Sequence, residues 1–421
     1  MAAAAELKRR FRRISFAGIF FQGGAAAIDT STIVASLVNT ITGSPFAVGA
    51  AAAIVRYGWL FPQLFVAYFA QQSRRRMPFY KFGAFGRVLC LALVAALLLA
   101  SEAASAVVVI AGFFVLWTAY AFVSGIVAVP YNDIVARAIV PARRSRMLAV
   151  RFFGGGVLAL LVAAVAHRLL DALPFPGGYA SIFFIGTGLL LVSAIAFVSA
   201  GEPEAPSAAH AARSLRQFIG DGVTVLRNDR RFQLFVHARW LDGAVAMALP
   251  FYAVLAMAGG ITQSGIALLL AAQTAGALLS NPLWGWWGDY QGKRSLLEGA
   301  TGLGVLAPML ALAWFIFDSA AAEFAMPWFA AIFFVLGAVG NGGTIAMLGY
   351  LMEISPDDRR PAYSGYFNAL VAPAALSPLI GAALVEIASL GVVFIASAAA
   401  AVVEFIAIRR LRRVPEGAST P

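Results

Sequence analysis

The sequence predicts an all-α integral membrane protein with twelve transmembrane helices in two six-helix bundles. Of its 421 residues, 61% are hydrophobic and 12% are charged, whereas soluble domains carry roughly 25% charged residues. Mean hydropathy is +0.83. Long apolar runs alternate with short basic clusters, a pattern typical of chains that cross a bilayer repeatedly. A polar interruption midway along the chain separates the two predicted bundles.

A helix needs roughly 20 apolar residues to cross about 30 Å of hydrocarbon. The basic start "MAAAAELKRRFRR" resembles a signal peptide, but the apolar run after it exceeds the ~7–15 residues of a signal core. We therefore interpret this run as a retained first span. In order, the predicted spans cover residues 14–40, 46–70, 79–100, 106–134, 147–170, 178–200, 231–258, 262–288, 295–317, 324–352, 364–387 and 390–408.

The basic clusters all fall on one side of this layout. They precede the first span, follow every even-numbered span and occupy the C-terminus, at residues 8–13, 74–81, 143–146, 213–231, 293–294, 359–360 and 409–413. The alternate loops hold Arg168 and the acidic Glu102, Asp171, Asp318 and Glu323. By the positive-inside rule, both termini are predicted to be cytoplasmic. The expected location is the bacterial inner membrane.

The polar interruption predicts three parts: a bundle over 1–199, a cytoplasmic linker over 200–230, and a second bundle with a basic tail over 231–421. The first part of the linker is rich in Pro, Glu and Ala. Its second part places four apolar side chains on one helical stripe, namely Leu215, Phe218, Ile219 and Leu226. This stripe favours a helix on the inner membrane surface, with a solvated helix as the alternative.

The two halves repeat each other. The stretch 139–153 aligns with 354–368, which places Pro141 on Pro356, Arg144 on Arg359 and Phe152 on Phe367. Each stretch connects the fourth span of its half to the fifth. Parallel repeats of six spans are one way in which secondary transporters are built.

The loop after the eighth span reads "GWWGDYQGKR", residues 285–294. We expect Gly285 to allow a close helix approach and Gly292 to adopt the left-handed conformation that ends a helix. Asp289 is a carboxylate at the membrane boundary, followed by the basic Lys293 and Arg294. A generic charged turn would explain the two basic residues but not the whole spacing.

This loop resembles the signature G-x-x-x-D-x-x-G-[KR]-[KR] of the major facilitator superfamily, and the span count, linker and repeat extend the resemblance along the chain. The resemblance implies that the loop latches the two bundles together on the cytoplasmic side, with Asp289 pairing to Arg146 or Arg151. The equivalent loop of the first half departs from the pattern, because Gln71 replaces the carboxylate and Arg74 the second glycine. The antiporter signature of the fifth span is also absent, which disfavours a drug/proton antiporter.

Ionisable residues inside spans are functional candidates. Asp29 and Arg56 lie at similar depths in adjacent antiparallel spans, so a buried pair would satisfy both charges. Three roles are open for Asp29: a structural pair with Arg56, a switch released by a proton or an anion, or an unpaired group in a water-filled passage. Arg239 and Asp242 are three residues apart on one helix face, with structural and coupling roles both open.

Other polar residues have a weaker claim to function. Asp133 and Arg137 lie one turn apart near the inner end of the fourth span, which favours pairing at the membrane interface. The resemblance implies that the first and seventh spans line a central cavity. Six further polar side chains could face this cavity: Gln22, Asn39, Gln63, Gln273, Asn341 and Asn368.

These observations predict a secondary transporter that moves a small anionic or zwitterionic organic solute by alternating access, coupled to protons. The sequence has no phosphate-binding loop, no nucleophile–base pair and no nucleic-acid motif. Its lone Cys90 and three scattered histidines predict neither a metal site nor a cofactor. We thus expect a monomeric, non-enzymatic protein whose partners are solute, protons and lipids. The alternatives are a lipid-handling or non-transporting assembly protein of the same fold, and a drug or metabolite efflux carrier.

Overall fold

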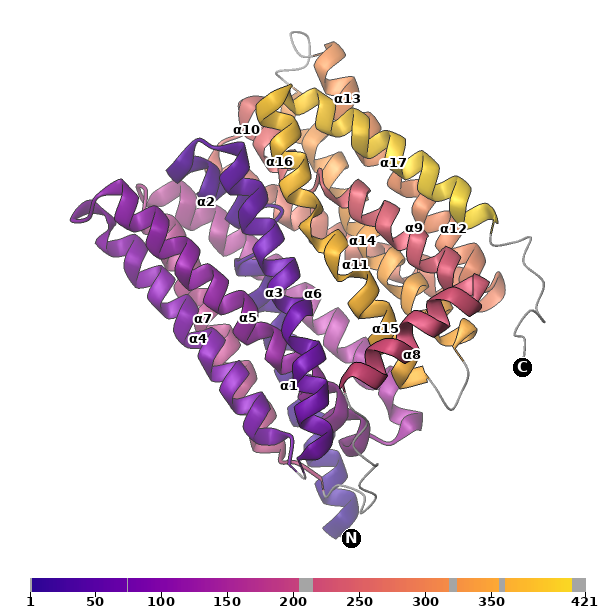
Figure 1. Ribbon diagram of the computed structural model, residues 1–421. Coiled ribbons are helices and arrows are strands. Elements are labelled where there is room, and N and C mark those ends of the chain that lie inside the picture. Colours follow the sequence, from indigo (N-terminus) through magenta and orange to yellow (C-terminus); the bar gives the residue numbers. More distant parts are fainter. Residues whose placement is uncertain (1, 74, 204–214, 318–323, 356–359, 411–421) are drawn as a thin grey trace. The chain divides into compact units, whose positions relative to one another are not determined.

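The computed structural model is helical throughout the residues it describes, which are 2–73, 75–203, 215–317, 324–355 and 360–410 (Figure 1). The helices are α1 Ala2–Ala27, α2 Ile33–Thr42, α3 Pro45–Gln72, α4 Met77–Leu99, α5 Ala106–Ala138, α6 Pro141–Ala172, α7 Gly177–Ala200, α8 Leu215–Asn228, α9 Arg230–Ala246, α10 Phe251–Ala258, α11 Gln263–Tyr290, α12 Lys293–Gly304, α13 Leu306–Phe317, α14 Ala325–Ile354, α15 Arg360–Val371, α16 Ser377–Ile387 and α17 Leu390–Arg410. Two 3-10 helices, η1 Ala100–Glu102 and η4 Ala372–Leu376, complete the set.

Ten helical stretches in the described part of the chain are long and apolar enough to cross a membrane. They correspond to the third to twelfth predicted spans. The first two predicted spans, formed by α1 with α2 and by α3, are helical but are not among the ten. The protein is therefore a multi-pass membrane protein, and the count of twelve stays a prediction.

Several spans predicted as continuous helices are interrupted. The seventh breaks before Pro250, the ninth after Gly304 and the eleventh at η4. Proline explains these breaks because it lacks the N–H that the helical ladder needs: Pro308 cannot donate to the Gly304 carbonyl, and Pro373 lies within η4. The first span also breaks, at residues 28–32. This segment contains no proline, and we attribute its break to the polar Asp29.

The chain forms two compact units. Unit 1 comprises Met1–Gly43, Ile54–Ala212 and Thr262–Ala271; unit 2 comprises Ser44–Ala53, Arg213–Ile261 and Ala272–Pro421. The helices α3 and α11 each begin in one unit and continue in the other.

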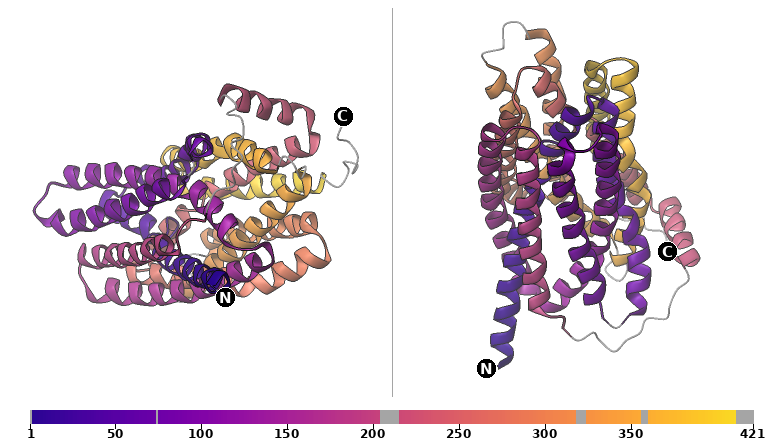
Figure 2. Two further views of the ribbon diagram at one scale, coloured as in Figure 1. Left: turned by 90° about the horizontal axis from the view of Figure 1, so that it is seen from below. Right: turned by 90° about the vertical axis from the view of Figure 1, so that its left-hand side faces the viewer.

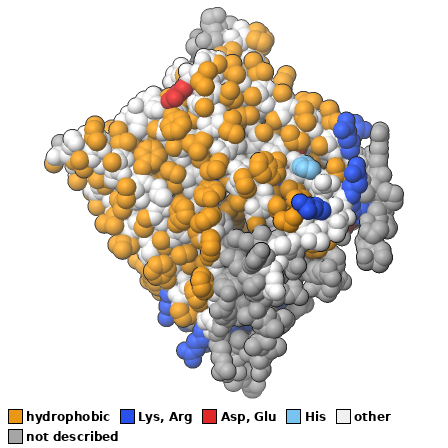
Figure 3. All heavy atoms as spheres, in the orientation of Figure 1, with side chains coloured by type: hydrophobic (Ala, Val, Ile, Leu, Met, Phe, Trp, Pro, Cys, Tyr) orange, Lys and Arg blue, Asp and Glu red, His pale blue; other side chains and the backbone are white. Residues whose placement is uncertain are grey.

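In unit 1, α4 packs against α5 and α7, and α1 packs against α6 and α7. Tyr80 and Phe197 meet in the core near the end of this bundle, with ring centroids 4.2 Å apart. Outward-facing side chains of α4 are apolar, as in Phe82 and Leu89. Figure 3 shows hydrophobic side chains over most of the visible described surface, and most of the visible Lys and Arg side chains lie toward its lower-left and right-hand edges.

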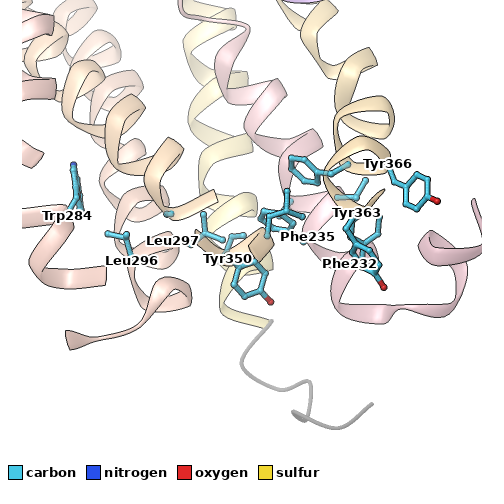
Figure 4. Close-up of a cluster of buried hydrophobic side chains, with 14 residues drawn as sticks. Phe232, Phe235, Trp284, Leu296, Leu297, Tyr350, Tyr363 and Tyr366 are labelled. Atoms are coloured by element: carbon cyan, nitrogen blue, oxygen red, sulfur yellow. The ribbon is translucent and has the colours of Figure 1, made fainter. Parts of the chain in front are cut away.

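In unit 2, a buried aromatic cluster anchors the first part of α9 (Figure 4). Phe232 packs on Tyr363 and Phe235 on Tyr350, at centroid distances of 5.1 and 5.0 Å. The predicted helix of the linker is present as α8, which contacts α9 and α15 and lies beside the other helices of unit 2 (Figure 2). Leu226 of its apolar stripe packs against this cluster.

Gly337→Ala is expected to destabilise the protein strongly, because α14 crosses α11 at this residue. A Cβ on Gly337 would overlap the Gln273 carbonyl oxygen, so the two backbones would have to separate at a cost of about 3 kcal/mol. Gly340→Ala, three residues along the same helix, would meet no atom within 4 Å. Thermal melting in detergent should show a large loss for the first variant and none for the second; equal melting temperatures would contradict this account of the crossing.

Candidate functional site

Asp29 lies in the turn that separates α1 from α2 in unit 1. Its Oδ1 accepts hydrogen bonds from the Ser31 N–H at 3.0 Å, the Ser31 hydroxyl at 2.6 Å and the Thr32 hydroxyl at 2.9 Å. Short polar side chains compete in this way with the helical ladder, which explains the interruption of the first span. Oδ2 makes no hydrogen bond with the described residues.

The structure does not bring Asp29 and Arg56 into an ion pair. None of the ion pairs within 4.0 Å among the described residues joins them. Oδ1 of Asp29 is bonded to donors on its own turn, and a pairing of Asp29 with Arg56 stays a prediction. Arg56 lies within α3, partly buried.

Sequence reasoning missed a cationic site in unit 1, made by Arg87 and Arg151. Arg87 of α4 is 4% exposed, and its Cζ lies 5.0 Å from the centroid of the Phe21 ring. Arg151 of α6 lies 5.6 Å from the same ring and donates a hydrogen bond to the Tyr131 hydroxyl at 3.0 Å. One aromatic ring thus carries two guanidinium groups, an arrangement that cation–π attraction supports.

Neither arginine has a carboxylate partner within the described residues. The Nε atoms of Arg87 and Arg151 are both buried without a hydrogen-bond partner. Guanidinium groups stay charged, and a buried charge without a counter-ion is unfavourable. The site is therefore suited to attract an anion. The sequence carried a signal for it, because Arg87 lies in the middle of the apolar run 79–100.

In unit 2, Arg239 and Asp242 form an ion pair on α9, with Nη2 and Oδ2 2.8 Å apart. This is the contact that their spacing indicated. The Nε of Arg239 is buried and has no hydrogen-bond partner. The fully buried Glu404 of α17 lies within electrostatic reach of both residues. The sequence carried a signal for Glu404 as well, since it is an isolated carboxylate in the run 390–408.

Gln63 and Asn341, two of the six polar candidates, make hydrogen bonds whose partners lie within their own unit. Gln63 donates to the Trp59 carbonyl one turn earlier, at 2.8 Å. Asn341 of α14 donates to the side chain of Asn281 on α11 at 2.6 Å. Both contacts stabilise helices, and neither points to a ligand.

The other four candidates are scattered over several helices. Gln22 lies where α1 crosses α6, because a Cβ on Gly155 would lie 2.6 Å from its Cβ. Asn39 lies on α2, Gln273 on α11 and the exposed Asn368 on α15. Their role in a cavity stays a prediction.

The signature loop lies between α11 and α12. Gly292 has φ 84° and ψ 158° and is the N-cap of α12. The positive φ favours glycine, but the conformation is not the left-handed helical one expected at a helix end. Asp289 pairs with Lys293 at 3.2 Å, and Arg294 with Glu298 at 3.8 Å. A Cβ on Gly285 would meet no atom within 4 Å. No described residue therefore makes the close approach that was expected at Gly285.

The proposed partners of this loop belong to unit 1. Arg146 is exposed on α6, whereas Arg151 is engaged with the Tyr131 hydroxyl. Gln71 lies at the end of α3, and Arg74 lies outside the described residues. The latch itself stays a prediction.

Glu202 organises a charge network at one end of unit 1. Its carboxylate accepts the N–H groups of Arg76 and Met77 at the start of α4, at 2.8 and 2.9 Å, and pairs with Arg137 at 2.8 Å. Arg137 also pairs with Asp133 at 2.6 Å, as their spacing indicated. Burial raises the pKa of Glu202, but the hydrogen bonds from Arg76, Arg137 and Met77 outweigh it and the pKa falls below its ordinary value.

Glu202→Gln is expected to lower the free energy of unfolding by about 2 kcal/mol at neutral pH, because Arg137 and the α4 terminus lose their anionic partner. A lowered folded-state pKa stabilises above the unfolded-state pKa, and this contribution disappears as the pH falls through the folded-state value. Melting curves of the wild type and the variant should therefore converge in acid. A difference independent of pH would contradict the charge-based explanation.

No three His, Cys, Asp or Glu side chains among the described residues come together as a metal site.

Residues 241–421 match the sequence profile of the Major Facilitator Superfamily. An uncharacterized protein of Mycobacterium tuberculosis (strain ATCC 25618 / H37Rv) is 24% identical over 191 residues. That match covers 45% of this chain and 37% of the relative, so it spans well under half the relative's length.

Solved transporter structures share the fold over nearly the whole chain. A D-xylose-proton symporter is 15% identical, with TM-score 0.73 and coverage of 98% of this chain and 99% of that one. A point mutant of the nucleoside transporter NupG is 14% identical, with TM-score 0.72 and coverage of 96% and 99%. An auto-inhibited POT family peptide transporter is 11% identical, with TM-score 0.73 and coverage of 97% of each chain. Residues 241–421 thus match the Major Facilitator Superfamily profile, and the chain as a whole shares the fold of these solved transporter structures.

Proposed function

We propose that this protein is a secondary transporter that moves a small anionic or zwitterionic organic solute across the cytoplasmic membrane, coupled to protons. The profile match over residues 241–421 and the shared fold of solved transporters support transport. The charge of the solute is argued from one observation, the buried Arg87 and Arg151 on the ring of Phe21. A site with two cations and no carboxylate partner in the described residues favours an anionic group.

Proton coupling is argued from carboxylates that lie within predicted spans. Asp29 has a carboxylate oxygen left over at a helix break, and Asp242 is partly exposed beside Arg239. In this proposal Asp29, Arg56, Arg239 and Asp242 bind solute or protons. The similarity to a D-xylose-proton symporter supports a coupled proton.

The proposed cycle exposes the solute site to each side of the membrane in turn. In this proposal the chain has twelve spans and both termini are cytoplasmic. One bundle covers 1–199, a linker covers 200–230 and the second bundle covers 231–421. The loop containing Asp289 holds one state of the cycle closed on the cytoplasmic side. One chain is sufficient for this cycle, so the proposed unit is a monomer.

The test is uptake into proteoliposomes under an imposed proton gradient. The panel contains radiolabelled organic acids, amino acids, neutral sugars and organic cations, with protein-free liposomes and a protonophore as controls. We expect one acid or zwitterion to accumulate and the protonophore to abolish its accumulation. Accumulation of cations alone would overturn the proposed charge, and movement of labelled lipid without any solute would favour the lipid-handling alternative.

A further inference from the structure

Glu404 is a buried carboxyl group with one oxygen that has no hydrogen-bond partner in the described structure. It lies six residues before the end of α17, in an otherwise apolar stretch. Its side chain is 4% exposed, and Oε1 is buried without a hydrogen-bond partner. Ionised carboxylates are not left in this condition, because the cost of burying an unpaired charge is several kcal/mol or more.

The charges around Glu404 are unbalanced when all groups are ionised. The helix α17 packs against α9, α12, α13 and α16. The titratable and charged side chains on these helices are Arg230, Arg231, His237, Arg239 and Asp242 on α9, Lys293, Arg294 and Glu298 on α12, and Glu386 on α16, with Arg409 and Arg410 on α17 itself. Among them, the groups whose charges act on Glu404 are Asp242 and Arg239. Two carboxylates therefore lie within electrostatic reach of one guanidinium.

Arg239 is already committed to one of the two carboxylates. Its Nη2 pairs with Oδ2 of Asp242 at 2.8 Å, while its Nε is buried with no partner. The same side chain thus satisfies Asp242 and keeps an unused donor in the interior. Like charges that share one site cannot both ionise readily. A single proton on one of the two acids makes the cluster neutral.

We propose that Glu404, Arg239 and Asp242 form a one-proton site, in which the proton resides on Glu404 while Arg239 pairs with Asp242. The exposure of the two acids supports this assignment. Asp242 is paired with Arg239 and is only partly buried, whereas the buried Glu404 can be stabilised only by a proton or by Arg239. Identification of this proton with the transported one rests on the proposed function.

The exchange between the two acids is balanced. When Asp242 takes up a proton from solution, its bond to Arg239 weakens and the guanidinium becomes available to Glu404. Glu404 then releases its own proton and pairs with Arg239. One proton enters, one leaves, and the cluster retains one throughout.

The proton is tested first without any solute, by infrared difference spectroscopy of the full-length protein in nanodiscs. The spectrum of the wild type minus Glu404→Gln should contain the C=O band of one protonated carboxylic acid at neutral pH. Asp242→Asn should lose this band, because Arg239 is then free to pair with an ionised Glu404. Glu298→Gln is the matched control, since Glu298 is a buried glutamate with its own partner, Arg294. It should show no such band.

Retention of the band in Asp242→Asn would overturn the sharing of Arg239, and absence of the band in the wild type would overturn the protonated Glu404. Melting temperatures confirm that each variant is folded.

The glutamine variant resembles the protonated acid in shape, so a purely structural Glu404 would leave transport unchanged. We expect Glu404→Gln to transport with loss of its dependence on the pH gradient, and transport with unaltered coupling would overturn the assignment to the coupled proton. Presence of the band without any proton-coupled transport would instead overturn the proposed function and leave the one-proton site intact.

Discussion

Asp29→Asn is expected to abolish accumulation of solute against its gradient while exchange of solute across the membrane continues. The reason is that the amide cannot bind or release a proton, although it has the same shape. One coupled proton drives about tenfold accumulation per unit of pH gradient. In the variant, the internal and external concentrations should therefore become equal.

The hydrogen bonds of Asp29 allow two effects to be measured separately, that of its negative charge and that of its side chain on the conformation of the turn. An Asn oxygen can accept the three hydrogen bonds that Ser31 and Thr32 donate to Oδ1. Asp29→Ala removes these bonds together with the charge and should lower the free energy of unfolding by about 2 kcal/mol. The Asn variant should consequently melt near the wild type and fail in coupling, whereas the Ala variant should be impaired in both.

Uptake and counterflow in the same proteoliposomes measure the two activities. Uphill uptake at the wild-type level by Asp29→Asn would remove Asp29 from the coupling machinery. A melting temperature of Asp29→Asn as low as that of Asp29→Ala would show that the negative charge itself stabilises the turn, and Asp29 would then be assigned a structural role.

The helices could be predicted from the sequence because each span depends on a continuous run of apolar residues. A run of apolar residues between basic clusters reports its own length, and the ten spans of the structure fall on the third to twelfth predicted runs. The interruptions are of two kinds. Those near Pro250 and Pro373 follow from a rule that sequence reasoning could have applied. The break at Asp29 depends on which donors its carboxylate finds, and pattern analysis does not supply that information.

The candidate sites were predicted less completely, for a related reason. Arg239 and Asp242 lie on one helix, so their spacing alone indicated the ion pair that the structure shows. Asp29 and Arg56 lie on different helices, and equal depth in the membrane does not determine which faces meet. Arg87 and Glu404 were visible as isolated charges in apolar runs, but their environments depend on packing between helices.

Arg87→Leu is expected to stabilise the protein and to abolish transport of the anionic solute. A buried guanidinium without a counter-ion opposes folding, and replacement of buried charges by apolar side chains can stabilise by about 1–4 kcal/mol. If the group is retained to bind an anion, the same change removes a charge-assisted contact that contributes about 1.5–3 kcal/mol to binding. Solute affinity should then fall by about 10- to 100-fold.

Arg409→Leu is the matched control for this change. Arg409 also lies over an aromatic ring, with its Cζ 5.6 Å from the centroid of Phe405, but it is exposed at the end of α17. It should alter neither the melting temperature nor the affinity appreciably. A fall in the melting temperature of Arg87→Leu would mean that Phe21 and its surroundings already compensate for the cation, and Arg87 would be structural. A rise in melting temperature with unchanged affinity would separate Arg87 from solute binding, and the case for an anionic solute would then rest on Arg151 alone.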